Sequence, residues 1–229
     1  MAEHHTAEEV EQQFLVAMGP QLGALFYRLW NECVWLHWRW SEYLILYGTK
    51  AESVELLNKA APSFFRVVQD SLWETVLLHI CRMTDPTEST RRPNLTLQAL
   101  PPLVATEIRP RVESLVQQAL DRCTFARDWR NRRIAHRDLA LALGQSALPL
   151  VSASRQSVRA ALESIVSTLN AVDDHYRNAN TAYDAVPPAG NAEALLYVLQ
   201  DGLDAEAERE RALRRQFGEE SPTQRGSKP

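Results

Sequence analysis

Residues 112–137 read VESLVQQALDRCTFARDWRNRRIAHR, a stretch that joins an amphipathic segment to a concentrated run of basic residues. Its apolar residues recur at steps of four, three, four and three, which is the spacing of one face of an α-helix. These residues are Val112, Val116, Ala119, Cys123 and Ala126. The pattern predicts a helix that buries one stripe against a core.

Helical spacing also dominates the rest of the chain, and no segment shows the sustained alternation of apolar and polar residues that is typical of strands. We therefore expect an all-α fold, an antiparallel helical bundle of about five to six helices with a long first helix. That first helix is predicted over about 7–47 with a bend at Gly19-Pro20, because proline lacks an N–H group and clashes with the preceding turn. Further helices are predicted over about 51–60, 62–84, 104–143, 155–182 and 192–217.

The composition is that of a globular protein with one core. Of the 229 residues, 45% are apolar and 24% are charged, and the six tryptophans argue against a solvated, unfolded chain. We expect a single helical domain over 1–217, followed by a disordered tail over 218–229. The formal net charge of −4 gives no general attraction to nucleic acid, so any such contact requires a local basic patch.

The start of the chain, MAEHHTAEEVEQQ, has neither the basic region nor the apolar run of a secretory signal. The most apolar stretch, residues 22–47, is interrupted by Arg28, Glu32 and Arg39 among others, which is too much charge for a membrane-spanning helix. We therefore expect a cytoplasmic protein without membrane contact.

The three cysteines, Cys33, Cys81 and Cys123, are odd in number, widely spaced and surrounded by apolar residues. This pattern favours reduced thiols in the core over a disulfide framework. Cys33 with His37, and His79 with Cys81, are better explained by core packing than by zinc binding, and the second pair has the wrong helical spacing for a shared face. We predict no metal site and no cofactor.

The basic segment, Arg127–Arg137, holds five arginines and one histidine. Arg130 lies eighteen residues, or about five helical turns, beyond Val112, so it should project from the same line as the apolar stripe. A guanidinium group is costly to bury unpaired, which favours a seam, a cleft or an oligomer interface for Arg130. On a straight helix, His136 would lie about 120° away and about 9 Å further along. We therefore predict that the helix loosens near 134–136, or that a second subunit completes the site across a two-fold axis.

The run Arg130-Asn131-(four residues)-His136 at the end of a helix resembles the R-X(4–6)-H motif of the HEPN superfamily. The surrounding text, YGTK…LLNKAAPSFFRVVQDSLWE…CRMTDP…NLTLQ…CTFARDWRNRRIAHRDL, is similar to its abortive-infection, AbiU-like branch. The resemblance extends from about Tyr43 to Leu203. It implies a helical homodimer that acts as a metal-independent endoribonuclease in a phage-defence or toxin–antitoxin system, with RNA as substrate and an antitoxin protein as a further partner.

The resemblance maps the arginine of the motif to Arg130, the polar residue after it to Asn131 and the histidine to His136. RNA can supply its own 2′-hydroxyl as nucleophile, so the protein has to move protons and stabilise charge on the phosphate. Histidine can act as base or acid near neutral pH, and arginine binds phosphate through a planar fork of donors. We expect His136 to transfer protons, Arg130 to bind the scissile phosphate and Asn131 to orient either one. Flanking phosphates would be bound by Arg127, Arg132, Arg133 and Arg137.

Ordinary structural roles stay open for two of these arginines. Asp128 lies four residues before Arg132, a spacing typical of an exposed ion pair on a helix. Trp129 can shelter the aliphatic stem of Arg133. These roles would leave less of the basic segment for RNA.

Acidic residues of the helix predicted over 62–84 offer partners for the basic segment. Arg66, Asp70 and Glu74 advance by four, so Asp70 and Glu74 either support the site with a carboxylate or belong to a solvated salt-bridge ladder. Arg82 and Asp85 flank the end of the same helix, where capping or bracing of the following loop is expected.

Two other functions stay open. One is a non-catalytic HEPN-like module whose arginines bind RNA, a nucleotide or an acidic partner. The other is a structural subunit that uses the first helix as an oligomer interface, because its tryptophans project over more than one face. These tryptophans are Trp30, Trp35, Trp38 and Trp40. A P-loop hydrolase or a zinc protease has no support, because the glycine-rich loop and the HExxH sequence are both missing.

Overall fold

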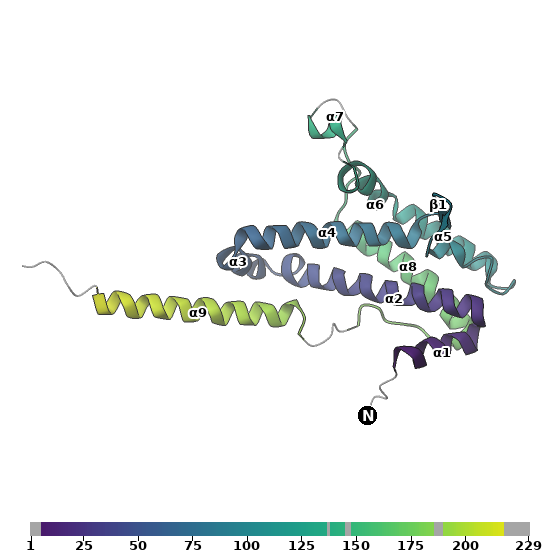
Figure 1. Ribbon diagram of the computed structural model, residues 1–229, viewed down its shortest axis with the longest axis horizontal. Coiled ribbons are helices and arrows are strands. Elements are labelled where there is room, and N and C mark those ends of the chain that lie inside the picture. Colours follow the sequence, from purple (N-terminus) through teal and green to yellow (C-terminus); the bar gives the residue numbers. More distant parts are fainter. Residues whose placement is uncertain (1–5, 137, 145–147, 186–189, 218–229) are drawn as a thin grey trace, which may run out of the picture. The chain divides into compact units, whose positions relative to one another are not determined.

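The computed structural model of the chain describes residues 6–136, 138–144, 148–185 and 190–217 (Figure 1). Over these residues the fold is all-α, as predicted, and one hairpin of two two-residue strands is the extent of the described sheet structure. The helices are α1 (Ala7–Met18), α2 (Pro20–Tyr43), α3 (Ala51–Ala60), α4 (Pro62–Thr84), α5 (Arg109–Arg122), α6 (Thr124–Trp129), α7 (Leu139–Ala142), α8 (Arg155–Arg177) and α9 (Ala192–Phe217). The strands are β1 (Glu88–Ser89) and β2 (Arg92–Pro93). The tail predicted over 218–229, and Arg137, lie outside the described residues.

Contacts among the described residues divide the chain into two units. The first contains the described residues of Met1–Tyr43 and Gln69–Pro187, and the second contains those of Leu44–Val68 and Pro188–Pro229. None of the described helices is both long and apolar enough to cross a membrane.

The first helix predicted over 7–47 is in fact two helices that pack against each other, α1 and α2 (Figure 1). Gly19 adopts a φ of +80°, which favours glycine, and its N–H donates to the carbonyl oxygen of Leu15. The chain then folds back, and the two helices approach so closely that a β-carbon at Gly23 would lie 2.5 Å from the carbonyl oxygen of Phe14. The sequence predicted a bend within one helix, whereas the chain reverses direction between two helices. Periodicity alone does not reveal a chain reversal at a glycine.

The core of the first unit includes the seam between α5 and α8. The predicted stripe is buried over its whole length, at Val112, Val116, Ala119, Cys123 and Ala126. A capping box formed by Ser154 and Ser157 begins α8, and Asn178 in a left-handed conformation ends it at Arg177, earlier than the predicted end near 182.

The helix predicted over 104–143 is broken, and its pieces position the basic segment. At Cys123 the backbone leaves the helical conformation, with ψ at 3°, and the Thr124 hydroxyl donates to the carbonyl oxygen of Asp121 at 2.9 Å. This side-chain bond takes over an acceptor that a continuous helix would use. The short helix α6 follows and leads into the π-helix η3 (Arg130–Ile134).

In the second unit, α9 packs on α3 and on the π-helix η1 (Leu44–Gly48). The bounds of α3 and α9 are those predicted. The Tyr47 hydroxyl donates to the carbonyl oxygen of Phe65 at 2.8 Å, which holds η1 against the first turn of α4. Beyond Leu203 the described residues of α9 are exposed.

Candidate functional site

The middle of the basic segment, Arg130–Ile134, is a π-helix. The N–H of Ala135 donates to the carbonyl oxygen of Arg130 at 2.8 Å, five residues back instead of four, and the chain then bends through His136. The loosening predicted near 134–136 is therefore confirmed, and it begins earlier, at Arg130. Short π-helical turns are rare and are often found at functional sites.

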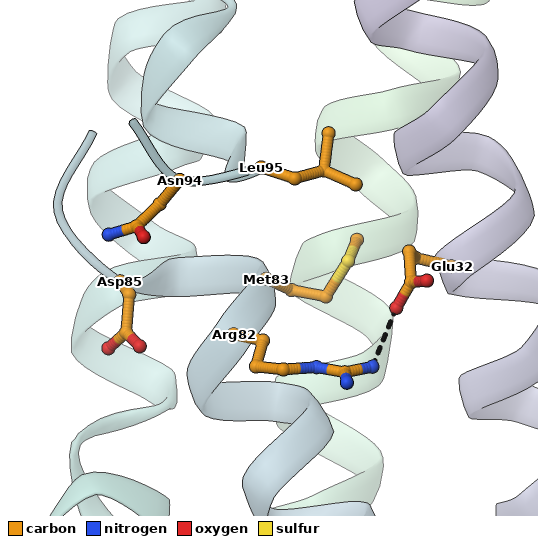
Figure 2. A pocket seen from close by; sticks show the side chains of 6 residues that line it. All are labelled: Glu32, Arg82, Met83, Asp85, Asn94 and Leu95. Carbon is orange, nitrogen blue, oxygen red and sulfur yellow. Dashed lines mark hydrogen bonds and ion pairs between the residues drawn. The ribbon is translucent and has the colours of Figure 1, made fainter. Parts of the chain in front are cut away.

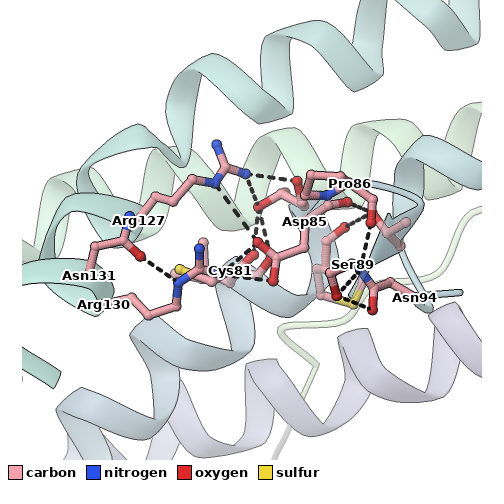
Figure 3. A network of polar contacts seen from close by, with 12 residues as sticks. Cys81, Asp85, Pro86, Ser89, Asn94, Arg127, Arg130 and Asn131 are labelled. Carbon is pink, nitrogen blue, oxygen red and sulfur yellow. Dashed lines mark hydrogen bonds and ion pairs between the residues drawn. The ribbon is translucent and has the colours of Figure 1, made fainter. Parts of the chain in front are cut away.

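Arg130 is fixed by a carboxylate from the end of α4. Its Nη1 donates to both carboxylate oxygens of Asp85, at 2.7 and 2.8 Å, and its Nε donates to Oδ1 of Asn131 at 3.1 Å (Figure 3). The Arg130 side chain is 26% exposed. Arg130 is thus half-buried where η3 meets the residue that follows α4, and its charge is paired.

Asp85 is itself held in place. Its backbone carbonyl oxygen accepts from the Thr96 hydroxyl at 2.7 Å and from Nε2 of Gln98 at 2.9 Å. Arg127 adds a brace from the other side, because its Nη2 donates to the carbonyl oxygen of Thr84 at 2.7 Å (Figure 3). Sequence reasoning expected loop bracing from Asp85 and missed its bond to Arg130, since helical periodicity gives no register between separate helices.

Two thiols lie behind this network, Cys81 and Cys123, and both are buried and free. Burial raises the pKa of Cys81 to about 11 and that of Cys123 to about 12. Both groups therefore stay protonated near neutral pH. The prediction of reduced core thiols is confirmed for these two and for Cys33, which is also buried.

His136 stands apart from the Arg130 network. The residue is exposed, and within the described part of the chain it has no hydrogen bond or ion pair. The structure thus brings Arg130 and Asn131 into contact and leaves His136 free at the open end of η3. A single chain does not assemble all three predicted catalytic residues.

A sequence model of the HEPN_AbiU2 family, described as AbiU2, matches residues 19–195 of the chain. The chain belongs to this family. The AbiU-like resemblance is confirmed, and the match includes Asp85, Arg130 and His136. No curated protein and no solved structure matches the chain.

In this HEPN_AbiU2 chain, Arg132 has the structural contacts that its spacing allowed. Its guanidinium lies 3.5 Å from a carboxylate oxygen of Asp128 and 3.4 Å from one of Asp138, and its Nη2 donates to the carbonyl oxygen of Leu148. The Leu141 N–H donates to Asp138, and this bond is the largest influence that holds the pKa of that carboxyl below its usual value. Arg132 therefore ties the end of η3 to the segments on either side of α7.

Arg133 has a different environment on the same HEPN_AbiU2 segment. Its guanidinium carbon lies 5.2 Å from the centre of the Trp129 ring, in a cation–π contact. The Trp129 ring is fixed by a bond from its Nε1 to the carbonyl oxygen of Val151 at 2.8 Å. The sheltering of Arg133 by Trp129 that the sequence allowed is thus present.

A pocket of about 250 Å³ adjoins these arginines. It is lined by Glu74, Arg132, Arg133, Asp138, Leu141 and Ala142. Glu74, one of the two predicted supporting carboxylates, therefore reaches the basic segment. Asp70 lies one helical turn earlier on α4 and is not among the lining residues.

A second pocket, of about 270 Å³, has Asp85 in its lining (Figure 2). It is lined by Glu32, Arg82, Met83, Asp85, Asn94 and Leu95. Arg82 donates to Glu32 at 2.7 Å, and the buried His79 ring lies between Glu32 and Arg39, with Nε2 and Nδ1 at 2.7 and 2.8 Å from them. Burial, aided by the positive charge of Arg82, lowers the pKa of His79 to about 4, so this ring is neutral at pH 7. The described residues include no cluster of His, Cys, Asp and Glu suited to a metal ion.

Proposed function

We propose that this HEPN_AbiU2 protein is a metal-independent endoribonuclease of a phage-defence (abortive infection) or toxin–antitoxin system. It acts in the cytoplasm and cleaves RNA through an R-X5-H motif, with Arg130, Asn131 and His136 as catalytic residues. The observation that carries the proposal is the position of Arg130 and Asn131 on a π-helix, with Arg130 held by Asp85 and His136 exposed just beyond the end of this helix.

The chemistry needs a proton carrier and a phosphate clamp. The 2′-hydroxyl of the RNA attacks the adjacent phosphorus, the bond to the 5′-oxygen of the next nucleotide breaks, and a 2′,3′-cyclic phosphate remains. His136 takes the proton of the 2′-hydroxyl or supplies one to the leaving oxygen. Arg130 binds the phosphate through Nη2, because its Nη1 and Nε are used by Asp85 and Asn131. Donors held in place before the reaction can contribute a few kcal/mol of transition-state stabilisation.

A homodimer supplies the rest of the site. His136 of one chain has no orienting partner among the described residues, so a second copy that faces it would bring another Arg130–His136 pair to the same RNA. Proton donor and acceptor would then come from the two chains. An antitoxin protein that covers this face would silence the enzyme.

A non-catalytic binding module is the second candidate, and one observation favours it. Both carboxylate oxygens of Asp85 already contact Arg130, which is also what a purely structural arginine would show. In that case the basic segment binds RNA with a steep dependence on salt and leaves it intact.

Cleavage of single-stranded RNA in the presence of EDTA separates the two candidates. The nuclease proposal predicts cleavage by the wild-type chain and loss of cleavage in both Arg130→Ala and His136→Ala. Cleavage that persists in both variants, or that requires a divalent ion, would falsify the proposal. Salt-dependent binding without product would support the binding module.

A further inference from the structure

The pocket beside the motif has the size of a single flat ring system. Its volume of about 250 Å³ is below the roughly 300–1,000 Å³ of pockets for drug-sized ligands. Its walls come from α4, η3 and the segment around α7, with apolar surface from Leu141 and Ala142. Arg133 belongs to both the pocket lining and the basic segment, and it precedes His136 by three residues in the sequence.

Two of the four charged residues in the lining form the wall of the pocket. Arg132 and Asp138 contact each other at 3.4 Å, and each is also held by the backbone, Arg132 through the carbonyl oxygen of Leu148 and Asp138 through the N–H of Leu141. Their polar atoms are therefore largely occupied. Glu74 and Arg133 are the charged groups left to contact a ligand.

Glu74 and Arg133 are both available for hydrogen bonding. The half-buried Glu74 carboxylate has no hydrogen bond or ion pair within the described residues. Arg133 is oriented by the face of Trp129 and not by a carboxylate, so its N–H donors remain open. Trp129 is held in turn by Val151 and by an edge-to-face contact with Trp73, with ring centres 6.4 Å apart. The pocket thus offers a pair of acceptors and a fork of donors on a rigid aromatic support.

We propose that this pocket binds an unpaired guanine base of the RNA, an inference that rests on the proposed function. Guanine carries two adjacent donors, N1–H and the exocyclic amine, which match the two oxygens of the Glu74 carboxylate. It also carries two adjacent acceptors, O6 and N7, which arginine binds with two parallel bonds. Adenine, cytosine and uracil have no two neighbouring donor atoms on one edge, and none of them has the O6–N7 acceptor pair of guanine. Single-stranded RNA leaves both edges of the base open to side chains.

Binding of defined RNA by the full-length His136→Ala chain tests the inference, because it does not depend on cleavage. The probes are a fluorescent oligoadenylate with one central guanosine and the same oligonucleotide with inosine, which lacks only the exocyclic amine. We expect the guanosine probe to bind about tenfold more tightly, the effect of losing one good base contact. Glu74→Gln in the same background should abolish this difference. Glu113→Gln on the exposed surface of α5 is the matched control and should keep it.

Equal binding of the two probes, tighter binding of an all-adenosine probe, or a preference for guanosine that survives Glu74→Gln would each overturn the inference. The preference for guanosine and the proposed nuclease activity can each fail without the other. Selective binding of guanosine by a wild-type chain that cuts no RNA would support the guanine pocket and contradict the nuclease. Cleavage by the wild-type chain together with equal binding of the two probes would support the nuclease and contradict the guanine pocket.

Discussion

The two ends of the basic segment differ in how the fold treats them. Arg127 and Arg130 are half-buried and bonded to the end of α4, through Thr84 and Asp85. At the other end, Arg133 and His136 are exposed, and His136 has no polar contact within the described residues. One run of like residues therefore combines a bonded end, which is anchored to the fold, with an exposed end, where we propose that the substrate or a second chain binds.

The largest expected effect separates chemistry from stability. His136→Ala should lower the rate of RNA cleavage by about 10²–10⁴-fold, the usual contribution of a general acid or base. Its free energy of unfolding should stay within about 0.5 kcal/mol of the wild type, because an exposed side chain without partners is removed. Rate measurement and urea unfolding on the same preparation check both parts. A strongly destabilised variant would contradict the division of the segment.

Asp85→Ala, unlike His136→Ala, should lower the stability of the fold. It leaves the half-buried Arg130 without its carboxylate, and the loss of a charged hydrogen-bonded partner costs about 1–3 kcal/mol. Cleavage should fall as well, because Arg130 is no longer held. Urea unfolding measures the first effect. Asp174→Ala, at an exposed residue of α8, is the control and should unfold like the wild type; equal stability of Asp85→Ala and this control would mean that the anchor contributes nothing.

The half-buried His37 and the buried His79 should make the fold sensitive to acid, in contrast to the exposed end of the segment. Burial lowers the pKa of both His37 and His79 to about 4. Between that value and the usual pKa of about 6.5, the unfolded chain binds more protons than the folded one, so stability is present above pH 6.5 and is lost as the pH falls towards 4. We expect a loss of about 1–2 kcal/mol per histidine between pH 7 and pH 5. His79→Gln should lose less over this range, and stability that rises on acidification would contradict the burial of neutral rings.

The smallest effect distinguishes two neighbouring arginines. Arg133→Ala should weaken the binding of guanosine-containing RNA by about 1 kcal/mol, because it removes the proposed contact to O6 and N7 of the base, with little change in stability. Arg132→Ala should instead loosen the segment around α7, since it removes the contacts to Asp128 and Asp138. Binding titrations at several salt concentrations, paired with thermal unfolding, compare the two. Identical profiles for both variants would show that their different contacts have no consequence.

Local pattern predicted much of this fold. The stripe from Val112 to Ala126 and the bounds of α3, α4 and α9 follow from periodicity and from Pro62 and other breakers, which act within a few residues. The sequence predicted only a bend at Gly19. Glycine permits a positive φ but does not require one, so the reversal of the chain could not be read from the residue type.

The site was less accessible from the sequence. Arg130 and His136 were predicted from the resemblance to the HEPN motif, and the angle between them on a straight helix predicted the loosening now seen as η3. The hydrogen bond that Arg130 donates to Asp85 joins residues 45 positions apart in the sequence. It depends on the packing of two helices, which no local pattern encodes. The position of Glu74 in the same pocket lining as Arg133 depends on the same packing.

The chemical nature of the new RNA ends tests the central claim most directly. Mass spectrometry of the products formed in EDTA should find a 2′,3′-cyclic phosphate or its 3′-phosphate product on one fragment and a 5′-hydroxyl on the other, because the 2′-hydroxyl is the nucleophile. The same ends should disappear with His136→Ala. Fragments with a 3′-hydroxyl and a 5′-phosphate, or RNA that stays intact with the wild-type protein, would contradict the account.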